Sequence, residues 1–552
     1  MIQKILAFLP LPIFVPMALI AADVGSDRQP QGAGPISQES PIAAPVQDES
    51  PASKKKILDL VRRGVVVIDV KTYASIDSEK RSAWTGSGFI VHIDPQEDYA
   101  IIATNRHVVG DMTVSTYTVK FSNGTTATAQ LLYFDPLFDF AFLKIEKAKL
   151  PKDAVALELS EKPLEVNTSV YTMGNSAKDE FSTYKCTLFS LYEMLGPFAE
   201  QSVKFAGLTV PGASGSPGFD ESGKVVLIVY GGKFTSGAGL PITYVSDALS
   251  ALKQKKQPSR RSLGICPQYT SLEDLVKVGL LPVSAMQEYL NAFPDANNKV
   301  LMINSRMAGS EASQVFEPGD ILWKIGDKLI GPKVYDLDKI VNAMGQNETV
   351  TLAFYRKGEL KEAKVKTYPL TLTSAQHMIA FADAAWVQNG EFVRLFLGHE
   401  KEGIFMLGVG QTSPFKSLFN ADLSSFFMDT RVIQVTELDG KPLKNLDDLV
   451  SLIPSLMQKR EFTVKYIDFM GMVGLGMFSP ADRKERLAVV TYESKFDSPK
   501  YYTFNTKKNE WDTVDLSGGS KPVINNGKPF AAEADVSAGA PGMSMVNPLS
   551  KP

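Results

Sequence analysis

Short runs of β-branched and apolar residues, often alternating with polar ones, recur between about residues 57 and 252. Turn-forming pairs such as Asn123-Gly124 and Asp135-Pro136 separate the runs. Many short strands at this spacing are typical of an all-β sandwich or barrel. We therefore expect a mainly β domain over 54–253 that ends in a helix. The expected strands are 64–70, 86–93, 99–104, 118–121, 127–133, 140–145, 169–173, 208–210, 225–230 and 239–245.

The second half of the chain repeats one order of elements. A strand-turn-strand pattern at 321–330 is followed by an amphipathic helix from 336 and a strand at 349–356. The same order recurs at 432–443, 445–450 and 461–467. Two copies of one small α+β module explain this pattern better than one large domain. We place the modules at 262–370 and 371–514.

The segments between and beyond these units are polar. Residues 23–53 and 515–552 are rich in Pro, Ser, Gly and Ala or Gln and show no apolar period, which predicts a disordered tether and tail. The basic run 253–261 is typical of a solvated linker, although contact with an acidic partner is an alternative.

The N-terminus predicts export. Lys4 precedes an apolar run at 5–20 that ends in small residues, as in a secretory signal peptide, which we place at 1–22. The alternative is an uncleaved anchor, but the run is short and contains three prolines. We therefore expect a periplasmic or secreted protein.

Composition narrows the class of protein. The 552 residues suffice for several domains, and 58 basic against 61 acidic residues leave no overall positive field, which disfavours nucleic-acid binding. The two cysteines, Cys186 and Cys266, allow at most one disulfide, and two separate thiols are the simpler interpretation. The chain has no P-loop, and we expect neither a cofactor nor a metal.

Three short stretches carry residues suited to nucleophilic catalysis. His107 follows an apolar strand, Asp139 stands at the entry to a buried strand, and Ser214 lies in a glycine-bounded turn. A serine hydroxyl needs a general base within hydrogen-bond reach and a carboxylate that orients that base. Together the three segments supply this set, although each residue alone also has a purely structural interpretation.

Two further points concern the same segments. Asp135 competes with Asp139 for the carboxylate role, but an Asp-Pro pair is a common turn start, which favours Asp139 as the catalytic residue. The backbone N–H groups of Gly212 and Ser214 would form an oxyanion hole, which requires unusual backbone angles at Gly212 and Gly215.

These stretches resemble a known family. The segments Thr104-Asn-Arg-His107-Val-Val, Asp139-Phe-Ala-Phe-Leu-Lys-Ile and Gly212-Ala-Ser214-Gly-Ser-Pro look like the three active-site blocks of the HtrA/Deg serine proteases. The resemblance implies a chymotrypsin-like double β-barrel at 54–253, followed by two small α+β PDZ-like domains at the module positions. The segment 438–445 is similar to the second PDZ domain of the plant-type Deg branch.

The resemblance also implies a function. It predicts an ATP-independent serine endopeptidase of the cell envelope that degrades unfolded or damaged proteins through an acyl-enzyme. The PDZ-like modules would capture peptide C-termini, with Leu263, Gly264 and Ile265 as the peptide-binding loop; a simple strand start is the alternative. A homo-oligomer, a trimer in the family, is expected, although 57–63 lacks the aromatic residues that many members use for trimer contacts.

Two features leave alternatives open. Ser216 stands where most of the family has glycine, which keeps open a chaperone-like or scaffold protein with a weak or silent protease domain. A protease held latent by its modules, with 177–201 as a mobile sensor loop, is a third hypothesis. If the domain is active, Ile228 and Tyr230 should wall the substrate pocket and favour small or medium apolar residues before the scissile bond.

Overall fold

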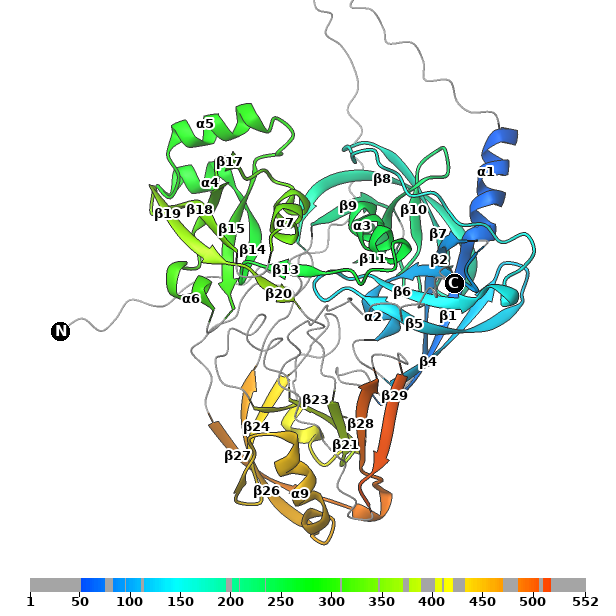
Figure 1. The fold of residues 1–552 in the computed structure, drawn as a ribbon, viewed down its shortest axis with the longest axis vertical. Coiled ribbons are helices and arrows are strands. Elements are labelled where there is room, and N and C mark those ends of the chain that lie inside the picture. Colours follow the sequence, from blue (N-terminus) through cyan, green and yellow to red (C-terminus); the bar gives the residue numbers. More distant parts are fainter. Residues whose placement is uncertain are drawn as a thin grey trace, which may run out of the picture. The chain divides into compact units, whose positions relative to one another are not determined.

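The computed structural model describes residues 51–74, 83–94, 96–110, 114–194, 201–207, 209–233, 235–307, 310–345, 348–370, 377–388, 403–409, 412–419, 432–469, 485–505 and 510–517 (Figure 1). The predicted signal peptide, the tether before residue 51 and the tail after residue 517 lie outside the described residues.

The first half of the described chain contains two closed barrels, as in a chymotrypsin-like fold, so the predicted fold class is confirmed (Figure 1). All neighbouring strands within each barrel run antiparallel. The first barrel has the order β1-β2-β3-β6-β5-β4, and the second has the order β10-β11-β12-β9-β8-β7. The first comprises β1 (Val65–Ala74), β2 (Ala83–Ile93), β3 (Tyr99–Thr104), β4 (Val114–Phe121), β5 (Thr126–Phe134) and β6 (Ala141–Glu146). The second comprises β7 (Ser169–Ser176), β8 (Asp179–Glu193), β9 (Ser202–Ala206), β10 (Pro217–Phe219), β11 (Val225–Lys233) and β12 (Ser236–Pro241).

The sequence of β1 shows why the barrels have buried strands. Its period-two alternation sends Val66 and Ile68 into the core of the first barrel. Val65 and Val67, on the opposite face, enter a second core that also holds residues of the second barrel, such as Phe219. A strand buried on both faces reads as a continuous apolar run, which is what the sequence shows.

Three helices accompany the barrels: α1 (Pro51–Gly64), α2 (Arg106–Val109) and α3 (Ile242–Lys253). Helix α1 packs Val61 into the second core, with Ile57 and Leu58 against it. It begins three residues inside the predicted tether, because Pro51 can occupy the first turn of a helix. Strand β8 occupies most of the segment expected to be a mobile sensor loop, and residues 195–200 of that segment lie outside the described residues.

The first α+β module follows the barrels. Its main sheet has the order β14-β15-β16-β18-β19, with β17 paired to β16, and a small separate sheet joins β13 to β20. The strands are β13 (Arg260–Ser262), β14 (Ile265–Ser271), β15 (Lys299–Arg306), β16 (Ile321–Ile325), β17 (Lys328–Leu329), β18 (Thr349–Arg356), β19 (Glu359–Lys366) and β20 (Tyr368–Leu370). The helices are α4 (Leu272–Lys277), α5 (Val283–Ala292), α6 (Glu311–Val315) and α7 (Val334–Asn342).

The second module repeats the strand, hairpin, helix, strand order that the sequence predicted. Strand β24 pairs with β25 and β26, and β26 pairs with β27, just as β16 pairs with β17 and β18, and β18 with β19. Its described strands continue through β23, β22, β21, β28 and β29. The elements are β21 (His377–Phe381), β22 (Ala384–Gln388), β23 (Ile404–Val409), β24 (Val432–Leu438), β25 (Lys441–Pro442), α9 (Leu446–Leu456), β26 (Glu461–Phe469), β27 (Glu485–Thr491), β28 (Lys500–Asn505) and β29 (Glu510–Asp515).

Within the described residues, no helix combines the length and the apolar character needed to cross a membrane.

Candidate active site

The predicted base and carboxylate meet in the first barrel. His107 lies on the one-turn helix α2 that directly follows β3, and Asp139 ends the turn that leads into β6. The His107 Nδ1 atom is 2.6 Å from Asp139 Oδ2, and the His107 backbone N–H donates to Asp139 Oδ1 at 2.9 Å. Asn105 Nδ2 donates to the Asp139 carbonyl oxygen at 2.8 Å, which fixes the backbone of the carboxylate residue. This geometry orients the imidazole as a general base requires.

The charge state of Asp139 follows from its surroundings. Burial by itself would raise its pKa, but the neighbouring His107 and the hydrogen bonds from its ring and backbone outweigh burial, so the pKa lies below its ordinary value. The side chain of Asp139 is 12% exposed, whereas that of His107 is 35% exposed. The carboxylate is therefore ionised and sheltered, while the imidazole remains reachable.

Asp135 has a different role from Asp139. Its carboxylate accepts the backbone N–H groups of Leu137 and Phe138, both at 2.9 Å. These are the bonds of an Asx turn, so Asp135 shapes the turn, as its position before a proline predicted.

The nucleophile turn lies between the second barrel and β2. Gly212 has φ 96° and Gly215 has φ 86°, as expected from the sequence. A Cβ atom at Gly212 would lie 2.3 Å from the Asn175 carbonyl oxygen, and one at Gly215 would lie 1.9 Å from the Ser87 carbonyl oxygen. Only glycine satisfies both the backbone angle and the space at these positions.

The hydroxyl and amides of this turn have distinct environments. Ser214 Oγ donates its hydrogen bond to the Tyr230 carbonyl oxygen on β11, at 3.2 Å, and not to His107. No described residue accepts a hydrogen bond from the N–H groups of Gly212 or Ser214. These two amides are thus available to an oxyanion.

Sequence reasoning missed Ser87, on β2. Its hydroxyl donates to the Gly212 carbonyl oxygen and accepts from the Asn175 N–H, both at 2.8 Å. Its backbone N–H donates to the Ser214 carbonyl oxygen at 2.7 Å. Ser87 therefore joins the first barrel to the nucleophile turn. The signal was a serine between two glycines, Gly86 and Gly88, in an otherwise apolar predicted strand.

Ser216 fits closely into its surroundings. Its side chain is buried, and its Oγ has no hydrogen-bond partner among the described residues. A Cβ atom at Gly174 would lie 1.9 Å from that Oγ, so the absence of a side chain at Gly174 makes room for the serine. The structure thus accommodates Ser216 without displacing the turn.

The two predicted pocket residues differ in position. Ile228 is completely buried in the core shared by the barrels, because β11 is covered on both faces. It therefore presents no surface to a substrate in this structure. Tyr230 is 8% exposed; its hydroxyl bonds to the Ser202 hydroxyl, and its carbonyl oxygen receives the Ser214 Oγ bond.

The predicted peptide-binding loop lies at the start of the first module. Gly264 has φ 72°, and its N–H donates to Ser262 Oγ at 3.0 Å. Leu263 and Ile265 are buried in the core of the module. One of the amides expected to receive a chain end is thus engaged by the serine.

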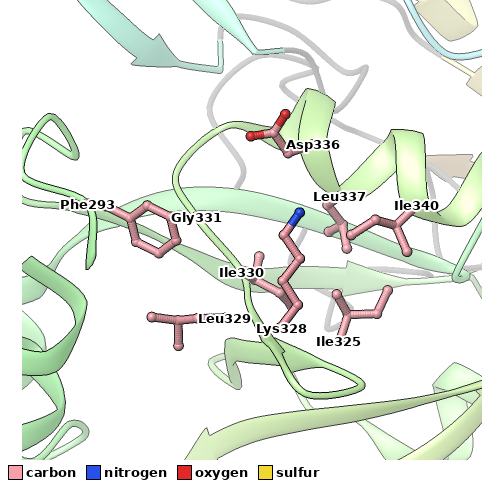
Figure 2. Close-up of a pocket in the computed structure, with 9 residues that line it drawn as sticks. All are labelled: Phe293, Ile325, Lys328, Leu329, Ile330, Gly331, Asp336, Leu337 and Ile340. Atoms are coloured by element: carbon pink, nitrogen blue, oxygen red, sulfur yellow. The ribbon is translucent and has the colours of Figure 1, made fainter.

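A small pocket in the same module lies between the β16–β17 hairpin, Phe293 and α7, as Figure 2 shows. Lys328 and Asp336 supply its charged groups, and the remaining side chains are mostly apolar. It contains none of the predicted site residues. No group of three or more His, Cys, Asp or Glu side chains within the described residues is arranged to hold a metal ion.

Comparisons with known proteins place the candidate site within a recognised type of domain. Residues 86–227, which include all three proposed triad residues, match the family model of the trypsin-like peptidase domain. Pro-apoptotic serine protease NMA111 of Lodderomyces elongisporus is 24% identical over 457 residues, covering 78% of this chain and 43% of that protein. Protease Do-like 7 of Arabidopsis thaliana is 24% identical over 520 residues, covering 87% of this chain and 43% of that protein. The chain thus spans less than half the length of these curated relatives.

Among solved structures, the HtrA-type protease AlgW with tripeptide matches with a TM-score of 0.43 and 17% identity, covering 58% of this chain and 97% of that one. The sequence relatives and the domain match agree with the resemblance of the active-site blocks. The chain therefore carries a trypsin-like peptidase domain and is similar in sequence to serine proteases of the HtrA/Deg type.

Proposed function

We propose that this protein is a serine endopeptidase in which Ser214 is the nucleophile, His107 the general base and Asp139 the residue that orients the base. The observation that carries the proposal is the His107–Asp139 pair, with a 2.6 Å contact between ring and carboxylate and a second bond from the histidine backbone. In the first step Ser214 Oγ attacks the scissile carbonyl and His107 takes its proton. The N–H groups of Gly212 and Ser214 receive the negative charge that develops on the carbonyl oxygen.

The wider role is also a proposal. Relatedness to the HtrA/Deg proteases favours unfolded or damaged proteins as substrates, degraded without ATP, with capture of peptide C-termini by the two modules. The edge position of β14 in its sheet supports capture, because an extended peptide can add to an edge strand. The apolar run at residues 5–20 supports export to a periplasmic or extracellular compartment.

A fluorophosphonate probe tests the proposal on the full chain. We expect the wild-type protein to be labelled and to degrade an unfolded casein-type substrate, while Ser214→Ala does neither. Ser216→Ala, which keeps Ser214, serves as the control and should still be labelled. Absence of labelling and of turnover in the wild type, also after addition of peptides with free C-termini, would favour the scaffold hypothesis. The hydrogen bond from Ser214 Oγ to the Tyr230 carbonyl oxygen is the observation that supports a latent form of the protease.

A further inference from the structure

The carboxylate of Asp135 is completely buried and receives four donors. Besides the N–H groups of Leu137 and Phe138 on Oδ1, its Oδ2 accepts the Tyr133 hydroxyl at 2.9 Å and Arg260 Nε at 2.6 Å. A buried carboxylate requires this compensation for its lost hydration. Arg260 is the cation that balances its charge, with a side chain only 7% exposed.

The turn that Asp135 closes is the one that carries Asp139. The Asp135 N–H donates to the Phe140 carbonyl oxygen at 3.0 Å, so the turn is closed at its two ends. Arg106, which precedes the catalytic histidine, donates through Nη1 to the carbonyl oxygens of Asp135 and Pro136, both at 2.9 Å. The position of the Asp139 carboxylate therefore depends on the bonds that hold this turn.

Arg260 contacts the turn a second time through packing. Its guanidinium carbon lies 5.0 Å from the ring centroid of Phe138 and 5.9 Å from that of Phe140. These two residues flank Asp139 in the chain. One arginine thus neutralises the carboxylate that shapes the turn and packs against both neighbours of the catalytic carboxylate.

Arg260 itself belongs to the first α+β module. It is the first residue of β13, which pairs with β20 in the register Arg260↔Leu370. The next residue, Arg261, donates its N–H to Asn342 Oδ1 at the end of α7, at 2.7 Å. Asp338, also on α7, interacts electrostatically with Arg260 and with Asp135. The elements of the module therefore set the position of the guanidinium.

We propose that Arg260 and Asp135 are positioning residues for the catalytic reaction: their ion pair holds the turn at which Asp139 meets His107, and it makes the triad geometry depend on the first module. The proposal rests on the endopeptidase function for its kinetic readout. Neither residue touches the reacting atoms.

The test compares two arginines in the full chain: Arg260, which is buried, and Arg356, whose side chain is 19% exposed. Arg260→Met removes the ion pair, and we expect kcat to fall roughly tenfold with KM nearly unchanged, because the carboxylate is held less well. The acid limb of the kcat/KM profile should move to lower pH, since a displaced Asp139 stabilises the imidazolium less. Arg356→Met is the control, because it removes the ion pair between Arg356 and Asp320 in the same module, away from the turn. It should change neither kcat nor the acid limb of the kcat/KM profile.

Two milder variants decide the question if Arg260→Met fails to fold. Arg260→Lys keeps the charge, and Tyr133→Phe removes one hydrogen bond to Asp135 while keeping the ring. Both should move the acid limb in the same direction by a smaller amount. If neither variant moves it while both remain folded in thermal unfolding, the positioning role is wrong.

A second readout is independent of turnover. The pKa of His107, followed by NMR and assigned with His107→Ala, should fall in Arg260→Met and stay in place in Arg356→Met. Suppose that the wild type shows neither labelling nor turnover but the His107 pKa still falls in Arg260→Met. This result would refute the endopeptidase function and support the positioning pair. Turnover in the wild type, combined with an unchanged His107 titration in Arg260→Met, would refute the positioning pair alone.

Discussion

At the scale of single residues, the nucleophile turn is set by two glycines. Gly212 and Gly215 both adopt positive φ, and both face a backbone carbonyl where a side chain would stand. The carbonyl that faces Gly215 belongs to Ser87, whose N–H also holds the Ser214 carbonyl. The approach of β2 to the turn therefore depends on a missing Cβ atom.

Gly215→Ala tests this dependence. The new Cβ atom would clash with the Ser87 carbonyl oxygen, so we expect kcat to fall by about 10²-fold or more through displacement of the oxyanion amides. Gly124→Ala is the matched control, because Gly124 also has positive φ but open space around it. It should lower the free energy of unfolding by roughly 1 kcal/mol and leave kcat unchanged. Equal kinetic effects of the two substitutions would contradict the steric argument.

At the scale of elements, α7 forms the predicted amphipathic helix and also carries an unexpected, partly buried acid, Asp338. Val334, Leu337 and Val341 face the core, as their spacing predicted. Asp338 Oδ2 is buried and has no hydrogen-bond partner among the described residues. Burial raises the pKa of Asp338 to about 7; Arg260 opposes the rise and Asp135 adds to it.

This pKa predicts a pH dependence of stability. Between about pH 4 and 7 the unfolded chain has released the Asp338 proton while the folded chain still holds it. The free energy of unfolding should therefore fall as the pH rises through this window, and Asp338→Asn should not show this fall. Urea unfolding midpoints of both proteins at pH 4, 6 and 8 measure this fall. The stability of Asp338→Asn relative to the wild type should increase toward pH 8. If wild type and Asp338→Asn differ in the free energy of unfolding by the same amount at all three pH values, the raised pKa of Asp338 is wrong.

At the scale of the whole molecule, the site exists only because two barrels meet. His107 and Asp139 come from the first barrel, whereas Ser214 stands on a turn of the second. Ser87 bridges them, since its hydroxyl bonds to Gly212 and to Asn175, both of which lie on the second-barrel side.

Ser87→Ala should weaken this junction. The buried Asn175 N–H and the partly buried Gly212 carbonyl lose their partner, so we expect the free energy of unfolding to fall by roughly 2 kcal/mol. We also expect a lower kcat with little change in KM, because the oxyanion amides are no longer fixed. Ser182→Ala serves as the control, since Ser182 Oγ makes only a 3.4 Å bond to the Gly174 carbonyl oxygen. Urea unfolding and steady-state kinetics measure both variants; a kcat for Ser87→Ala equal to that of the control would exclude the bridging role.

The sequence by itself determined the features that depend on local patterns. Apolar and β-branched runs predicted the strands of the first barrel and β7, β11 and part of β12 in the second, but they missed β8, β9 and β10. The helical period predicted α7 and α9. The repeated order of elements predicted the two modules. Glycines at Gly212 and Gly215 predicted the positive φ angles of the nucleophile turn, and the Asp-Pro pair predicted the turn at Asp135.

Only the tertiary structure decided which of these features touch one another. The sequence placed Ile228 in a pocket, but burial of both faces of β11 puts it in the core. Nothing in the local sequence indicates that Ser87 reaches Gly212, or that Arg260 pairs with Asp135 125 residues away. Such contacts arise from the closure of separate sheets around shared cores, and a local pattern carries no information about the partner that closure brings near.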